Sequence, residues 1–108
     1  MAAKTSPLGH AWALHREGRN EQALAEFDRI LREAPNDIDA NFGLGLTQRA
    51  LGRFDQAIEA FQKTKQLILK STQEIGGENR IEDRWAMLLK MCDQRIAETQ
   101  SAKASQPG

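Results

Sequence analysis

One stretch of this chain occurs twice, and the repetition limits the fold more than any other feature. Residues 18–27 read GRNEQALAEF and residues 52–61 read GRFDQAIEAF, at an offset of 34 residues. In each copy a Gly ends one helical pattern, and an Ala followed four residues later by a Phe lies on one face of the next helix. The sequence therefore predicts a repeat protein whose unit is a helical hairpin.

The residues around the two copies resemble the tetratricopeptide repeat, whose unit of about 34 residues carries W-x2-L-G-x2-Y, then A-x3-F, then P. Both units match this motif at small and apolar positions. The second unit supplies Leu44, Gly45, Ala57 and Phe61, and the first unit supplies Ala23, Phe27 and Pro35. These matches cover about two thirds of the chain, and the shared period is their specific part.

The chain departs from the motif mainly at the aromatic positions. The second unit holds Asn41 in the Trp slot, Gln48 in the Tyr slot and Leu69 in the closing Pro slot. At the start of the first unit, the Trp, Leu and Gly of the motif are replaced by Pro7, His10 and Ala11.

The resemblance implies an all-α fold, a short right-handed α-solenoid of antiparallel helix hairpins with five helices. Capping signals place Ser6 before the first helix, Asn20 before the second, and Asn36 or Asp37 before the third. The expected helices span about residues 7–17, 21–33, 38–51, 55–74 and 80–99.

These helices are expected to form one domain at residues 6–100. Within it we expect repeat 1 at about 4–37, repeat 2 at about 38–71 and a capping helix at about 80–99. Residues 1–5 and 101–108 are expected to be disordered ends.

The expected capping helix follows a loop predicted by the paired Gly76 and Gly77. Its apolar residues fall on one face, and part of it resembles the opening of a third unit, with Trp85, Leu88 and Cys92 in the Trp, Leu and Tyr slots. Such a helix would cover the apolar face that the second hairpin leaves open.

Charge and cysteine content restrict the possible partners. Fifteen basic and fifteen acidic residues give a formal net charge of zero, so no overall field attracts nucleic acid or an anionic membrane. Cys92 is the single cysteine and lies in a helical apolar pattern, which favours a buried hydrophobe over a reactive thiol. With neither a signal-peptide pattern nor an apolar run of membrane-spanning length, we expect a soluble cytoplasmic protein.

No grouping of residues predicts catalysis, a cofactor or a metal. His10 and His15 are separated by about 140° around a helix, so they cannot share a metal ion. Gly43 and Gly45 invite a phosphate-loop interpretation, but they fall inside an expected helix with no preceding strand, which favours close helix packing. We therefore expect a protein that is not an enzyme.

The resemblance also implies a concave groove, lined by the first helix of each unit, that takes a segment of another protein. Carried onto this chain, the groove positions give an apolar floor of Leu8, Trp12, Phe42, Leu46 and Met87, edged by His15, Arg16, Arg49 and Lys90. Such a strip suits a peptide with apolar anchors and a carboxylate, with Trp12 and Arg49 as energetic centres. The expected function is that of an interaction module or adaptor.

Two alternatives stay open at this point. Trp12 and Phe42 could pack on each other instead of facing a partner. The chain could also be a structural subunit whose apolar strip, or whose Met87 and Met91, mediates homo-oligomerisation or assembly into a larger complex.

Overall fold

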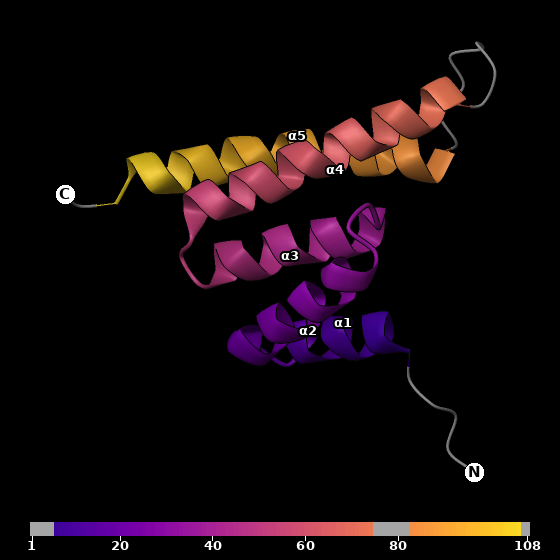
Figure 1. Ribbon diagram of the computed structural model, residues 1–108. Helices are drawn as coiled ribbons and strands as arrows, with labels where there is room; N and C mark the ends of the chain where they lie inside the picture. The colour runs from indigo at the N-terminus through magenta and orange to yellow at the C-terminus, as the bar shows by residue number, and fades with distance from the viewer. Residues whose placement is uncertain (1–5, 75–82, 107–108) are drawn as a thin grey trace.

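The computed structural model describes residues 6–74 and 83–106. In that part of the chain every regular element is an α-helix, in agreement with the predicted all-α hairpin fold. The helices are α1 (Pro7–Arg16), α2 (Asn20–Glu33), α3 (Ile38–Ala50), α4 (Phe54–Glu74) and α5 (Asp83–Ala104) (Figure 1).

Each helix packs against the next one in the chain. α1 packs on α2, α2 on α3, α3 on α4 and α4 on α5, and α1 also touches α3 (Figure 1). The ion pairs Lys65–Asp93 and Lys103–Asp55 fix the register in which α5 runs antiparallel along α4. Two hairpins followed by one long covering helix therefore build the domain.

The helix ends follow local chemistry. Ser6 Oγ accepts a hydrogen bond from the Gly9 N–H (3.0 Å) and caps α1, while Asp37 Oδ1 accepts one from the Ala40 N–H (2.9 Å) and caps α3. After α1 and α3, Gly18 and Gly52 adopt φ angles of +79° and +78°, which a residue with a Cβ rarely adopts.

The predicted cap of α2 is wrong. Asn20 is the first helical residue, and Arg19 takes the cap position without any side-chain hydrogen bond. The Asn20 side chain instead lies 3.2 Å from the ring of His15, so a tertiary contact replaces the expected local one.

The predicted disordered tail is wrong at its beginning. α5 continues to Ala104, because Thr99 is buried and Lys103 pairs with Asp55 of α4. Four of the predictions lie outside the described residues. They concern residues 1–5, the loop at 75–79, the start of the fifth helix at 80–82 and residues 107–108.

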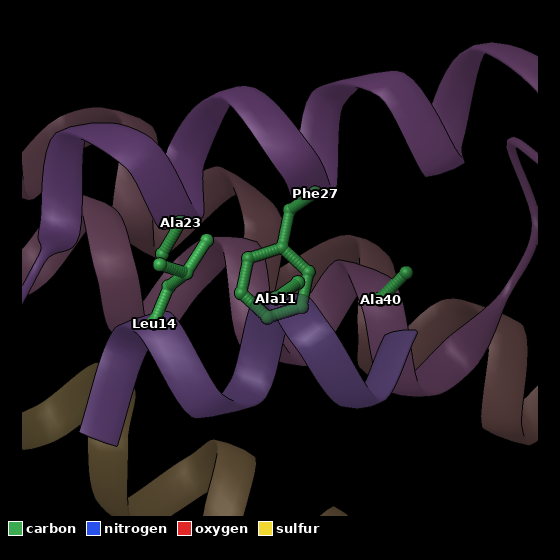
Figure 2. Close-up of a cluster of buried hydrophobic side chains, with 5 residues drawn as sticks. All are labelled: Ala11, Leu14, Ala23, Phe27 and Ala40. Carbon is green, nitrogen blue, oxygen red and sulfur yellow. The ribbon is translucent and has the colours of Figure 1, made fainter. Parts of the chain in front are cut away.

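A first cluster of buried side chains joins the first hairpin to α3. Figure 2 shows Phe27 pointing from α2 toward Ala11 of α1, with Ala23, Leu14 and Ala40 around it. A Cβ at Gly43 would lie 2.4 Å from the Phe27 ring, and one at Gly45 would lie 2.6 Å from the Phe61 ring. The two glycines thus let helices approach closely, as their place in the sequence predicted.

A second cluster lies between α3, α4 and α5. It consists of the buried residues Phe42, Ala57, Phe61 and Cys92, with Leu88 and Ile96 among the partly buried residues around it. Trp12 of α1 packs against both clusters. Its ring centroid lies 5.4 Å from that of Phe27 and 6.5 Å from that of Phe42. One side chain therefore bridges the two halves of the core.

Candidate functional site

The structure separates the nine predicted groove residues by exposure. Phe42 is only 5% exposed and packs against Phe61 at 5.7 Å, so its ring belongs to the core rather than to a surface floor. Leu8 and Trp12 are partly buried against the first cluster. The prediction that Phe42 faces a partner is therefore wrong, because α5 and Trp12 pack over it.

Three of the predicted residues meet in a hollow of about 400 Å³ between α1, α3, the start of α4 and the end of α5. We call it the Arg49 hollow, and it is lined by His15, Leu46, Arg49, Ala50, Phe54 and Ala102. The other six predicted residues do not line it, and of these Arg16, Met87 and Lys90 are exposed elsewhere.

Three lining residues, Ala50, Phe54 and Ala102, were not among those predicted from the sequence. Phe54 stands where the first copy of the repeat has Asn20. This change from a polar to an aromatic residue was a signal in the sequence that the position could line a site. Ala102 fell in the expected tail, although the spacing of three residues from Ile96 to Thr99 to Ala102 continues the buried stripe of α5.

His15 is held in one orientation at the wall of the Arg49 hollow. Its Nδ1 lies 3.2 Å from Asn20 Oδ1 and 3.5 Å from Thr47 Oγ1, and the Thr47 hydroxyl already donates to the Gly43 carbonyl. With Asn20 Oδ1 as the nearer neighbour and the Thr47 hydroxyl donating to Gly43, Nδ1 is the ring nitrogen that donates in this arrangement. In the neutral ring Nε2 is then left as a hydrogen-bond acceptor.

Arg49 meets a carboxylate of the same chain. Its guanidinium lies 3.4 Å from Glu98 of α5, and the same carboxylate oxygen lies 2.9 Å from Arg95. The hydrogen bond from Arg95 is the main reason that the pKa of Glu98 is lowered; burial opposes the shift, and the charges of Arg95 and Arg49 add to it. Glu98 is thus ionised at neutral pH and partly neutralises the expected basic rim.

Comparison with known families matches residues 8–67, which are 60 of the 108 residues, to the tetratricopeptide repeat. The chain belongs to the tetratricopeptide repeat family. Repeats of this family generally mediate protein–protein interaction and are typically not enzymes. The comparison finds no match among curated proteins or solved structures.

A second hollow, of about 540 Å³, opens between α2, α3 and α4 of this tetratricopeptide repeat protein. It was not among the sites predicted from the sequence. Its floor is formed by Asn41, Leu44 and Gln48 of α3, so it contains both of the residues that stand in the aromatic slots of the repeat. Asn41 and Gln48 in place of the aromatic residues of the repeat motif were the signal in the sequence for this hollow.

The described part of the tetratricopeptide repeat domain holds neither a cluster of metal ligands nor an accessible thiol. Among residues 6–74 and 83–106, no three His, Cys, Asp or Glu side chains are placed to hold one metal ion. Cys92 is buried as predicted, and burial, followed by the charge of Asp93, raises the pKa of its thiol to about 11. Over the same residues no helix is long and apolar enough to cross a membrane.

Proposed function

We propose that this tetratricopeptide repeat protein is an adaptor that binds a segment of a partner protein in the Arg49 hollow. The observation that supports the proposal is the convergence of four helices on one site that combines apolar side chains with the cationic Arg49. Leu46 and Phe54 supply apolar surface, Arg49 supplies a charge, and His15 supplies a fixed polar group.

The chemistry of the hollow favours a segment with one apolar anchor and one carboxylate. A volume of about 400 Å³ lies near the lower end of ligand sites, so it suits one or two side chains rather than a whole folded element. A carboxylate from the partner would take the place of Glu98 beside Arg49, where a guanidinium can bind it through two parallel hydrogen bonds.

Trp12 has a different part in this proposal from the one expected. Because its ring packs against Phe27 and Phe42, we assign it to the core that supports α1 and α3. Arg49 and Leu46 then remain as the proposed centres of partner binding.

A library of random linear peptides, displayed on phage and selected on the immobilised full chain, tests the proposal. We expect selected peptides to share an acidic residue next to an apolar one, and to lose binding to Arg49→Glu. The matched control is Lys70→Glu, which reverses an exposed charge on the C-terminal part of α4, whereas the hollow includes Phe54 at the start of that helix.

The outcome is measured as the Kd of synthetic copies of the selected peptides. Equal affinity for the wild type and Arg49→Glu, or failure to select any shared motif, would show that the hollow is not the binding site. Loss of binding in Lys70→Glu as well would indicate a general charge effect.

A second candidate function is self-association, and two exposed apolar side chains favour it. Leu69 is 45% exposed and Met87 is 67% exposed. In the register indicated by Lys65–Asp93, Leu69 of α4 lies level with residue 89 of α5, and Met87 is two residues away along that helix. If these two side chains pair two copies of the chain, the measured mass should rise with protein concentration, and the Met87→Glu variant should be a monomer. A constant mass near 12.1 kDa would exclude self-association.

A further inference from the structure

The second hollow and the Arg49 hollow lie on different faces of α3. Its floor residues Asn41, Leu44 and Gln48 are spaced by three and four residues, so they form one stripe along the helix. Leu46 and Arg49 lie on a stripe centred about 140° away around the same helix. The two hollows are therefore separate sites, and what binds in one does not follow from the other.

The floor of the second hollow combines apolar surface with one unsatisfied amide. Leu44, together with Leu31 of α2 and Ala60 of α4, provides the apolar part. Asn41 is held by the segment that precedes α3, since its Nδ2 donates to the Pro35 carbonyl (3.1 Å) and the Asp37 carbonyl (2.8 Å). Gln48 differs, because its Oε1 is buried and has no hydrogen-bond partner. A buried acceptor without a hydrogen bond is unfavourable in free energy. A hydrogen bond from a donor in the hollow to the Gln48 amide oxygen would therefore be stabilising.

The walls of the hollow carry balanced charge. α2 contributes Asp28 and Arg32, and α4 contributes Glu59 and Lys63, so each wall has one acidic and one basic residue. An anionic ligand would meet Asp28 and Glu59, and a cationic ligand would meet Arg32 and Lys63. An uncharged occupant avoids both conflicts.

We infer that the second hollow receives a tryptophan or tyrosine side chain from a partner protein. The aromatic body covers the apolar floor, and its N–H or O–H donates to Gln48 Oε1. The repeat motif itself has Trp and Tyr at the two positions that Asn41 and Gln48 occupy here, so aromatic rings suit the space between these helices. An aliphatic side chain would fill the floor but leave the Gln48 acceptor unpaired.

The test uses N-acetyl-L-tryptophanamide, which carries the side chain without the charges of the free amino acid. It is titrated into the full-length ¹⁵N-labelled chain and followed by NMR, because a single side chain binds weakly. We expect the largest shifts at the Gln48 side-chain amide and at residues of α2, α3 and α4 that line the hollow.

The matched probe is the same molecule methylated on the indole nitrogen, which has the same ring and no N–H donor. We expect it to bind the wild type about fivefold more weakly. Equal affinity of the two probes for the wild type, shifts confined to other faces, or no shift up to the solubility limit would overturn the inference.

Two variants separate the donor contact from the space. Gln48→Leu removes the acceptor and keeps an apolar floor, so both probes should bind it equally well. Gln48→Tyr fills the hollow from within, so probe binding should be lost while the Tm is unchanged or raised. Gln100→Tyr makes the same exchange at an exposed position of α5 and should bind like the wild type. Probe binding by a folded Gln48→Tyr variant equal to that of the wild type would also overturn the inference.

Discussion

At the scale of single residues, the closest helix contacts of this domain depend on two glycines, which have no side chain. Gly43 and Gly45 let the rings of Phe27 and Phe61 press against the backbone of α3, where even a methyl group would collide with them. The sequence suggested this role, because two glycines inside a helical pattern need a packing reason to offset their low helix propensity.

Gly43→Ala tests that contact. We expect a net loss of about 1–3 kcal/mol in the free energy of unfolding, because the new Cβ would lie 2.4 Å from the Phe27 ring and the buried ring must shift. Urea unfolding followed by circular dichroism measures it. A gain in stability, as alanine gives in an unobstructed helix, would show that α3 and α2 are less closely packed.

Cys92 gives a second test at this scale. A thiol whose pKa is raised from 9.0 to about 11 is one hundredfold less ionised at a given pH below these values, and it is also fully buried. We expect a thiol reagent such as dithionitrobenzoate to react at least about a hundredfold more slowly with the native chain than with the urea-unfolded chain at about pH 8. Similar rates would contradict the burial of this residue.

At the scale of helices, the attachment of α5 is the feature that the repeat motif alone did not define. The match to the family ends at residue 67, and α5 is held by its contacts with α4 and by the Arg49–Glu98 pair with α3. Both the length of α5 and its docking can be tested directly.

Glu98→Gln tests the docking of α5 through pH. Because the pKa of Glu98 is lowered in the folded state, its contribution to stability is present at neutral pH and is lost as the pH falls through that lowered value. We expect the variant to have a lower Tm than the wild type at neutral pH and the difference to disappear once the pH is below the lowered pKa of Glu98. The control Glu33→Gln, at an exposed position of α2, should show little difference at any pH.

Truncation after Gln100 tests the length of α5. It removes Lys103, whose exposed pair with Asp55 contributes up to about 1 kcal/mol, and Ala102, which forms part of the wall of the Arg49 hollow. We expect a small fall in the urea midpoint, with no change for a truncation after Gln106. Identical midpoints for both truncations would mean that residues 101–106 do not stabilise the domain.

The helices could be predicted from the sequence because the repeat fixes their spacing and the Gly and Pro residues fix their ends. The end of α5 was missed, because Ala102 alone continues the spacing of its buried residues there, and Lys103 pairs with a residue of α4 that is distant in sequence. The candidate site was predicted in part. Leu46 and Arg49 were placed by the repeat register, but the burial of Phe42 depends on a helix distant in sequence.

At the scale of the whole molecule, one aromatic residue links the two halves of the core. Trp12 contacts Phe27 of the first cluster and Phe42 of the second, so the stability of each hairpin depends partly on the other. Chains built from repeats owe their cooperativity to such contacts between units.

Trp12→Ala should therefore destabilise the entire domain. The expected loss is about 2–3 kcal/mol, below the range for a fully buried aromatic residue because Trp12 is partly exposed. Thermal and urea unfolding measure it, with the exposed Met87→Ala as a control expected to be neutral. A Trp12→Ala variant as stable as the wild type would return Trp12 to the surface role predicted from the sequence.

The pair between Arg49 and Glu98 has a consequence for any acidic partner. A carboxylate that binds Arg49 exchanges one ion pair for another, so the number of charges neutralised by the complex stays nearly the same. Affinity for such a partner should then change little with ionic strength, unlike that of a basic site that is vacant before binding. The released Glu98 would still have Arg95 as its neighbour, so the last turns of α5 would keep a charged partner while the hollow is occupied.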